Sequence, residues 1–203
     1  MSEKSDQFLS NRLPPELPPG LPAGLAALAA GAGAQAKPRP VERWDPPDCG
    51  AIDMRIAVDG TWYYRGSPIG REALTRLFAS ILRREPDGRH VLVTPVEKVG
   101  ISVDDAPFVA VEMRREGEGE AQRIVFRTNV GDLVEAGLEH PLRFALEAGT
   151  GGLKPYVLVR GRLEALVTRA VQQELVGIAA ERDGRPGIFA GGVFYAFPGA
   201  ALG

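Results

Sequence analysis

Three consecutive aromatic residues are the first candidates for contact with a ligand. Trp62, Tyr63 and Tyr64 follow one another in a stretch of strand-forming residues. Successive side chains of a strand point to opposite faces, so at least one ring is expected to face away from the core. Such a ring could stack on a planar ligand. The alternative is that helices and an N-terminal arm bury all three rings.

Two polar stretches provide further candidates. Thr94 precedes a proline, and Glu97 and Lys98 then present a carboxylate and an ammonium group that could meet a polar ligand. The alternative is a surface ion pair of little energetic value. Arg127 and Asn129 end a later strand with a planar cation and an amide, which suit phosphate, carboxylate or base edges. The alternative interpretation is that Asn129 caps a loop and Arg127 is simply exposed beside it.

A carboxylate in an apolar helical stripe is the last candidate. Glu174 lies between the apolar residues of the second predicted helix, and a buried carboxylate needs a cation, donors or a proton. Arg65, Lys98 or Arg127 could supply the cation. Alternatively, Glu174 reaches water at the edge of the stripe. An enzyme that uses Glu174 or Glu97 as an acid or base is the weakest hypothesis, because it needs a raised carboxylate pKa in a pocket.

Known catalytic and metal-binding motifs do not match the sequence. Ser67 is not central between Gly66 and Gly70, so this stretch is no nucleophile elbow. His90 and His140 have no Cys or carboxylate at ligand spacing, so we expect neither a metal nor another cofactor. Whether any catalysis occurs stays open.

Composition limits the classes of partner. The 26 acidic and 24 basic residues nearly cancel, which argues against binding to duplex nucleic acid or an anionic membrane. The single Cys49 forms no internal disulfide, as in a reducing compartment. The Ala-rich segment 20–36 is too short and too interrupted by glycine for a signal peptide or membrane span. We therefore expect a cytoplasmic protein.

The elements that position these residues begin with a hairpin. Asp59-Gly60 lies between two runs of strand formers and predicts a tight turn. Ser67-Pro68 favours a helix that begins at Pro68 and ends near Arg84. Its apolar stripe falls on Leu74, Leu77, Phe78, Ile81 and Leu82.

Alternating apolar residues predict a strand meander over 91–160, and a long helix is predicted from Arg162 to about Ala180. Pro-rich residues 1–20 favour a tail, and 21–36 favours a short helix that needs a docking surface. Trp44 could anchor the arm that follows. Residues 187–198 predict an extended, packed end.

The sequence also contains an ordered pair of similar motifs, which suggests a duplicated unit with a ligand cleft between its copies. The alternative is coincidence among common residue types. The first copy is Arg65-Gly66, Glu72-Ala73-Leu74 and Asp87-Gly88-Arg89, and the second is Arg160-Gly161, Glu164-Ala165-Leu166 and Asp183-Gly184-Arg185.

Longer motifs resemble a bacterial family designated domain of unknown function 1285. They are 52–56, 59–64, 93–100, 104–108 and 126–132, and the resemblance extends from about Val41 to Pro198. The resemblance implies a two-part protein with a duplicated core and a C-terminal part superficially similar to pleckstrin-homology-like folds. It further implies a nucleotide-like ligand at the domain interface and a role in signalling, and it supplies no catalytic residues.

We therefore expect an α+β protein of two related α/β units, the second a meander of antiparallel strands closed by a long helix. The expected divisions are a tail over 1–50, an N-terminal domain over 51–95 and a C-terminal domain over 96–203. The leading hypothesis is a non-catalytic regulatory protein that binds a nucleotide-like molecule between its domains. The alternative is a module for protein interaction or self-association, with a homo-oligomer left open. The candidate ligand-binding residues are Trp62, Tyr63, Arg65, Thr94, Glu97, Lys98, Arg127, Asn129 and Glu174.

Overall fold

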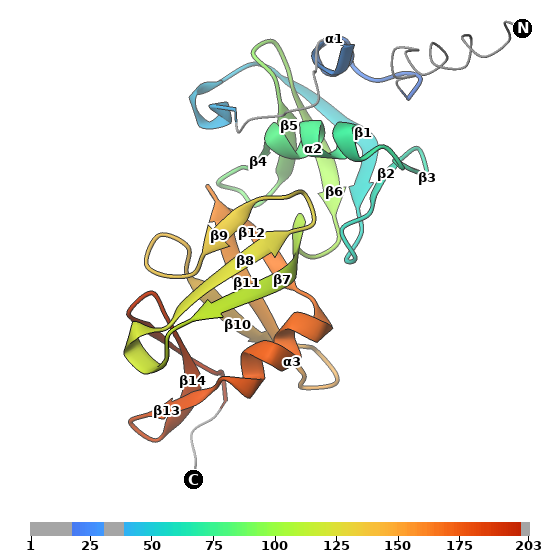
Figure 1. Ribbon diagram of the computed structural model, residues 1–203. Coiled ribbons are helices and arrows are strands. Elements are labelled where there is room, and N and C mark those ends of the chain that lie inside the picture. Colours follow the sequence, from blue (N-terminus) through green and yellow to red (C-terminus); the bar gives the residue numbers. More distant parts are fainter. Residues whose placement is uncertain (1–17, 31–38, 200–203) are drawn as a thin grey trace, which may run out of the picture.

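The computed structural model describes residues 18–30 and 39–199, which form two six-stranded sheets and a smaller one (Figure 1). Sheet A has the strand order β3-β2-β1-β6-β5-β4, sheet B the order β10-β11-β12-β7-β8-β9, and sheet C the order β13-β14-β15. The protein is thus α+β, as predicted. None of the helices in the described residues is long and apolar enough to cross a membrane.

The first domain is built on sheet A. Its strands are β1 (Asp48–Ile56), β2 (Trp62–Tyr64), β3 (Ser67–Pro68), β4 (Leu82–Arg84), β5 (His90–Val93) and β6 (Lys98–Val103). Its helices are α1 (Ala23–Ala30), the 3-10 turn η1 (Val41–Arg43) and α2 (Glu72–Ser80).

The second domain contains sheets B and C. Sheet B is formed by β7 (Phe108–Glu116), β8 (Arg123–Thr128), β9 (Leu133–Glu135), β10 (Leu142–Leu146), β11 (Leu153–Arg160) and β12 (Leu163–Val167). The 3-10 turn η2 (Gly119–Ala121) joins β7 to β8. After helix α3 (Arg169–Gly177), sheet C is formed by β13 (Ala180–Arg182), β14 (Arg185–Ala190) and β15 (Val193–Ala196).

The predicted hairpin at Asp59-Gly60 is confirmed. β1 and β2 pair antiparallel, the Asp59 carboxylate accepts a hydrogen bond from the Thr61 backbone at 2.9 Å, and Gly60 adopts a φ of +82°. Trp62 and Tyr64 are buried, and the Trp62 ring lies 6.1 Å from the Phe78 ring of α2. The prediction that β2 places rings on both of its faces therefore holds.

The predicted start of the first helix is wrong. Ser67 and Pro68 form strand β3, which pairs with Tyr64 and Tyr63, and α2 begins only at Glu72 without a side-chain cap. The Arg65-Gly66 turn folds the chain back before the helix, and Pro68 is tolerated because β3 is an edge strand. The helix also ends early, at Ser80, because the next residues form β4.

The long helix predicted over 162–180 is also wrong. Its first part is strand β12, which buries Leu163, Ala165 and Val167, and only Arg169–Gly177 is helical. Apolar residues at 163, 165, 166 and 167 fit a period of two as well as a helical stripe, and the pairing of β12 with β7 and β11 selects the strand. A short helix therefore follows sheet B, and sheet C follows that helix.

The duplicated arrangement is confirmed at the level of element order. β1, β2, β3, α2, β4, β5 and β6 recur as β10, β11, β12, α3, β13, β14 and β15. The Arg-Gly and Asp-Gly motifs occupy equivalent turns, but Glu72-Ala73-Leu74 lies in α2 whereas Glu164-Ala165-Leu166 lies in β12. The first unit joins β1 to β6 in parallel, whereas in the second unit β10 and β15 belong to different sheets.

The boundary between the two domains differs from the predicted one. β6 pairs with β1 and β5, so residues 98–103 belong to the N-terminal domain and not to a domain that starts at 96. The linker is therefore 104–107. Sheets A and B lie one above the other on either side of it, and one apolar core contains residues of both domains (Figure 1).

Candidate functional site

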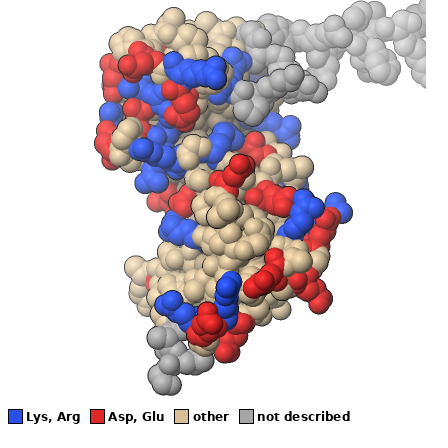
Figure 2. All heavy atoms as spheres, turned by 90° about the vertical axis from the view of Figure 1, so that its left-hand side faces the viewer, with Lys and Arg blue, Asp and Glu red and all other residues tan. Residues whose placement is uncertain are grey.

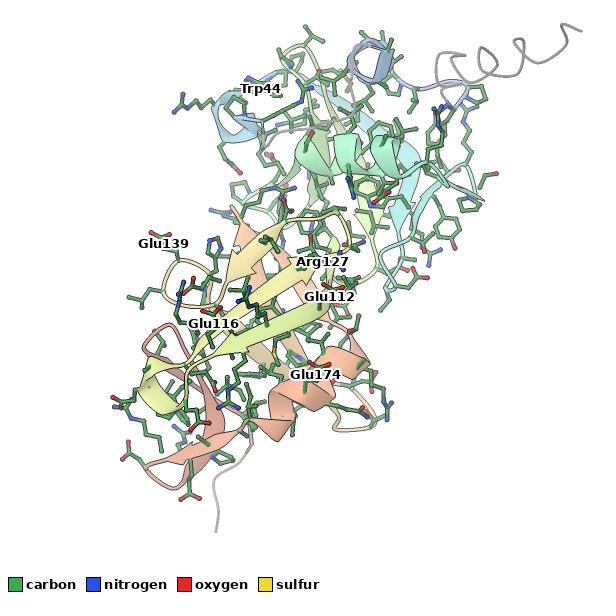
Figure 3. The ribbon with its side chains drawn as sticks, viewed as in Figure 1. Trp44, Glu112, Glu116, Arg127, Glu139 and Glu174 are labelled. Atoms are coloured by element: carbon green, nitrogen blue, oxygen red, sulfur yellow. The ribbon has the colours of Figure 1, made fainter. Side chains whose placement is uncertain are left out.

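The structure does not bring the nine candidate residues together. Figure 3 shows Trp44, Arg127 and Glu174 at separate places, on the arm before β1, on sheet B and on α3. Glu174 is exposed, which contradicts the expected burial in an apolar stripe. Three of the nine, Arg65, Thr94 and Glu97, lie against residues 18–30 of the same chain, and we call this contact region the α1 groove.

The turn between β5 and β6 forms one end of the α1 groove. Thr94 is only 1% exposed, and its Oγ1 accepts hydrogen bonds from the backbone N–H groups of Val96 and Glu97 at 3.3 and 3.1 Å. The same hydroxyl donates to the Glu97 carbonyl oxygen at 3.2 Å. These bonds fix the turn and thereby direct the Glu97 carboxylate towards α1.

Helix α1 docks on this turn by its N-terminal end. Glu97 Oε1 accepts a hydrogen bond from the Leu25 backbone N–H at 3.0 Å, and a carboxylate is favourable beside the positive end of a helix dipole. Leu25 and Ala29 are buried in the core. A Cβ at Gly24 would lie 2.6 Å from Glu97 Oε1 and 2.9 Å from Thr94 Oγ1, so this close approach requires glycine.

The segment before α1 contacts the other end of the groove. The Tyr64 hydroxyl donates a hydrogen bond to the Gly20 carbonyl oxygen at 2.7 Å, and the Arg65 guanidinium lies 5.4 Å from the Tyr64 ring centre and against Gly20. Beside this contact is a hollow of about 300 Å³ between Pro18-Pro19 and the start of α2. Backbone groups of Gly20 and Leu25 thus bind the Tyr64 hydroxyl and the Glu97 carboxylate of the groove.

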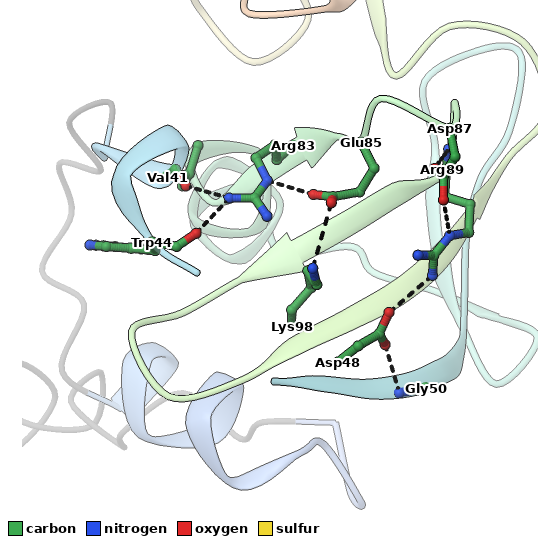
Figure 4. Close-up of polar contacts among 9 residues, drawn as sticks. All are labelled: Val41, Trp44, Asp48, Gly50, Arg83, Glu85, Asp87, Arg89 and Lys98. Carbon is green, nitrogen blue, oxygen red and sulfur yellow. Dashed lines mark hydrogen bonds and ion pairs between the residues drawn. The ribbon is translucent and has the colours of Figure 1, made fainter. Parts of the chain in front are cut away.

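Lys98 belongs to a different contact. Its ammonium lies 3.5 Å from Glu85, which also accepts a hydrogen bond from Arg83 at 2.6 Å (Figure 4). Arg83 donates in turn to the carbonyl oxygens of Val41 and Trp44 at 2.8 and 2.7 Å. This nearly buried cluster holds the arm before β1, and the Trp44 side chain packs against the core, so Trp44 anchors the arm as predicted.

Asn129 lies at the junction of the domains. Its Oδ1 accepts a hydrogen bond from the Val109 N–H at 3.0 Å, and its Nδ2 donates to the Gly60 carbonyl oxygen of the β1–β2 turn at 3.4 Å. Nearby, Arg160 pairs with Asp132 and donates to the Ala79 carbonyl oxygen at the end of α2, at 2.8 Å. These contacts tie the two domains together.

The linker also binds both domains. Asp104 accepts two hydrogen bonds from Arg55 of β1, whereas Asp105 pairs with Lys154 and accepts a hydrogen bond from Tyr156 of β11 at 2.8 Å. Because of these contacts, the pKa of Asp104 is lowered, chiefly by the Arg55 hydrogen bonds. The pKa of Lys154 is raised, chiefly by Asp105.

Arg127 and Tyr63 lie on open sheet faces. Arg127 forms two hydrogen bonds with Glu112 across β7 and β8, and this contact raises the pKa of Arg127 (Figure 3). The pair lines a shallow hollow of about 400 Å³ on sheet B. Tyr63 lies on the face of sheet A opposite buried Trp62, 5.8 Å from the Arg55 guanidinium.

Charge and metal-ligand distribution add no further site. Basic and acidic side chains are intermixed over the face shown in Figure 2. Within residues 18–30 and 39–199, no group of three His, Cys, Asp or Glu residues is placed to hold a metal ion.

Sequence reasoning missed Gly24, Leu25 and Arg160. The helix formers within residues 21–36 did predict a short helix that needs a docking surface, but they gave no indication that Gly24 faces Thr94 and Glu97. Arg160 was noticed only as half of a repeated Arg-Gly motif. Its contacts depend on the packing of α2 against the second domain, which local sequence does not reveal.

Comparison with known proteins identifies the family. The model described as "Domain of unknown function (DUF1285), N-terminal domain" matches residues 39–106, and "Protein of unknown function (DUF1285), C-terminal domain" matches residues 107–197. The two models meet within the 104–107 linker. The comparison with curated proteins gave no match.

Two solved structures are similar. The crystal structure of a DUF1285 family protein from Silicibacter pomeroyi DSS-3 is 49% identical with a TM-score of 0.80, over 86% of this chain and 94% of that chain. One from Shewanella baltica OS155 is 27% identical with a TM-score of 0.49, over 62% of this chain and 91% of that chain. From the two family models and the 49% identical structure, the chain belongs to the DUF1285 family.

Proposed function

We propose that this protein is a non-catalytic interaction module whose N-terminal domain binds a short helix in the α1 groove. In the structure the groove is occupied by the chain's own residues 18–30, which a partner helix replaces. The observation that carries this proposal is the preorganised Thr94–Glu97 turn, which caps a helix N-terminus while Leu25 and Ala29 enter the core.

The groove and its occupant differ in their relation to the family. Tyr64, Thr94 and Glu97 lie within the residues matched by the family model, whereas residues 18–30 precede them. The docking surface therefore belongs to the part of the chain that the family model matches, and the segment that occupies it precedes that part. Recognition of an amphipathic helix in an apolar groove is a common mode of peptide binding.

The occupant is suited to exchange. A helix of eight residues is not stable alone in water, so α1 depends on its docking contacts. It has no charged residue, and no ion pair holds it to the groove. A partner helix with a longer apolar stripe would replace it by mass action, which agrees with the signalling role that the family resemblance implies.

A nucleotide-like ligand at the domain interface has less support. The polar side chains there already have partners within the protein, so a ligand would have to replace these bonds. Asn129 bonds to backbone, Arg160 pairs with Asp132, and the two linker carboxylates are bound by side chains of β1 and β11. Similarity to pleckstrin-homology-like folds adds no lipid-binding role, because a fold alone does not transfer a function.

A direct test uses the full-length Leu25→Asp variant, in which a buried charge undocks α1 and leaves the groove accessible. A fluorescein-labelled peptide of residues 18–30 is titrated against it and followed by anisotropy. We expect saturable binding that falls at least tenfold with a Gly24→Val peptide or when Glu97→Gln is added to the protein.

The matched control is Leu25→Asp combined with Glu112→Gln, which alters a carboxylate outside the groove and should leave affinity unchanged. Wild-type protein should bind the peptide more weakly than Leu25→Asp, because its own segment competes. Absence of binding to folded Leu25→Asp, or equal binding of the Gly24→Val peptide, would refute the proposal.

A further inference from the structure

A third hollow lies on sheet C, far along the chain from the α1 groove. It has a volume of about 540 Å³ and is open to solvent, within the range of small-molecule sites. The hollow is lined by Arg182, Asp183, Arg185, Gly192, Val193, Phe194 and Ala196.

The register of sheet C places two arginines side by side. Arg182 of β13 is paired directly with Arg185 of β14, so their side chains share one face of the sheet. On β14 the same face continues to Gly187, and the Phe194 ring lies over that glycine, 2.7 Å from where its Cβ would be. Both arginines and Phe194 line the hollow, the Arg182 guanidinium lies 5.9 Å from the centre of the Phe189 ring, and that ring lies 4.8 Å from the Phe194 ring.

Neither arginine hydrogen-bonds to a carboxylate among the residues that the structure describes. Arg182 comes no nearer than 3.8 Å to Glu120 and 3.9 Å to Asp183, and Arg185 forms no ion pair with any residue that the structure describes. By contrast, Arg123 and Arg143 on sheet B each hold a carboxylate through two hydrogen bonds of 2.7 and 2.8 Å. Like charges directly opposite each other on a sheet are destabilising.

The duplication shows what an arginine at this position holds. Asp183-Gly184-Arg185 corresponds to Asp87-Gly88-Arg89 of the first unit, where Arg89 bonds to Asp87 at 2.8 Å and to Asp48 at 3.1 Å. Asp48 comes from β1, which pairs with β6 in the first unit. In the second unit β10 does not pair with β15, and no described carboxylate reaches Arg185.

We propose that this hollow is a binding site for a small planar aromatic compound that bears a phosphate or carboxylate group. Arg182 and Arg185 hold the anionic group through charge-assisted hydrogen bonds, as Arg89 holds Asp48. Phe194 contacts the flat ring of the ligand. The site is independent of the α1 groove and does not rest on the helix-binding proposal.

The test is a titration of the full-length protein with phenyl phosphate, followed by amide chemical shifts and by calorimetry. We expect shifts at Gly187, Gly192 and Phe194, and an affinity that falls at least tenfold in the Arg182→Gln/Arg185→Gln double variant. Arg114→Gln is the matched control, because it removes an exposed strand arginine on sheet B and should not change the affinity.

Three probes separate the parts of the ligand. Benzoate tests a carboxylate against a phosphate on the same ring, and binding of either compound at this site supports the proposal. Inorganic phosphate tests the ring contact, and it should bind at least tenfold more weakly than phenyl phosphate. The proposal fails if neither aromatic probe binds, if the double variant binds as well as wild type, or if inorganic phosphate binds equally well.

Discussion

A single missing side chain sets the fit between α1 and its groove. Gly24 approaches Glu97 and Thr94 so closely that a methyl group would overlap both side chains. The Glu97 carboxylate can move, but the Thr94 hydroxyl is buried and held by three hydrogen bonds. Thr94 is therefore the fixed point that defines which helices fit.

For this reason Gly24→Ala is expected to loosen α1, although alanine favours a helix over glycine by about 1 kcal/mol. Hydrogen exchange at the Leu25 amide should accelerate at least tenfold relative to wild type. Ala27→Gly, at an exposed position of the same helix, calibrates the effect of propensity alone. Slower exchange in Gly24→Ala would show that propensity outweighs the fit to Thr94.

His90 is expected to make folding sensitive to acid. Burial, with a smaller effect from Arg84, lowers its pKa from 6.5 to about 4, so the folded state disfavours the protonated ring. Below pH 6.5 the unfolded chain binds the proton more readily, so stability falls as the pH drops towards about 4 and then levels off for this group.

Urea unfolding of wild type and His90→Gln at pH 7 and pH 5 measures this effect. The loss of stability between the two pH values should be smaller in His90→Gln, because both proteins share the same carboxylates. Equal losses, or an NMR titration midpoint of His90 near 6.5, would contradict the assignment.

For single residues, the sequence predicted the environment of some side chains and not of others. It predicted rings on both faces of β2, and the structure confirms it with Trp62 buried and Tyr63 on the other face. It also predicted burial of Glu174, which failed because the first residues of the predicted stripe belong to β12 and only Val171 and Leu175 of α3 are buried. The width of an apolar helical stripe cannot be judged until it is known which of its residues belong to the helix.

The β14–β15 hairpin depends on a close contact between its strands. A Cβ at Gly187 would lie 2.4 Å from the Tyr195 carbonyl oxygen and 2.7 Å from the Phe194 ring. Gly187→Ala should therefore cost at least about 2 kcal/mol, in the range of overpacked core substitutions.

The measurement is urea unfolding of Gly187→Ala against Gly177→Ala. The latter adds a methyl group at the end of α3, where nothing lies within 4 Å, and should be neutral or slightly stabilising. Equal stability of the two variants would show that the hairpin opens at little cost.

Whether a segment forms a strand or a helix was predictable where its apolar residues fit only one of the two periods and turn residues marked its ends. β1, β2 and the central strands of sheet B follow from alternating residues and from the Asp59-Gly60 turn. Ser67-Pro68 and Leu163–Val167 were mistaken for helix because their local patterns also fit a helix start and a helical stripe. Strand partners from elsewhere in the chain decided both cases.

For the whole molecule, Arg160 is expected to couple the two domains. It joins Asp132 of the second domain to the end of α2 in the first, and its guanidinium lies 4.7 Å from the Phe108 ring centre. Arg160→Gln should cost about 1 to 3 kcal/mol, the usual range for a partly buried, charge-assisted contact that leaves its partners unpaired.

A double-mutant cycle with Asp132→Asn, measured by chemical denaturation, isolates the pair. We expect the double variant to lose less than the sum of the single losses, by about 1 kcal/mol. Additive losses would mean that Arg160 acts through the α2 carbonyl alone.

The duplicated plan could be predicted, but its two different closures could not. The Arg-Gly and Asp-Gly turns indicated two copies, and both occupy equivalent places in the structure. Whether the last strand of a duplicated unit pairs with the first strand of that unit depends on packing across the whole domain. β6 pairs with β1, whereas β15 lies in a separate sheet, and no carboxylate of the described residues pairs with Arg185.

Adjacent acidic residues in the linker have a mechanical consequence. Asp104 is attached to the first domain through Arg55, and Asp105 to the second through Lys154. A rotation of one domain relative to the other must therefore change the backbone φ and ψ angles between these two adjacent residues, or break one of the attachments. When a helix enters or leaves the α1 groove and rotates the first domain, the linker would therefore pass that rotation directly to the second domain.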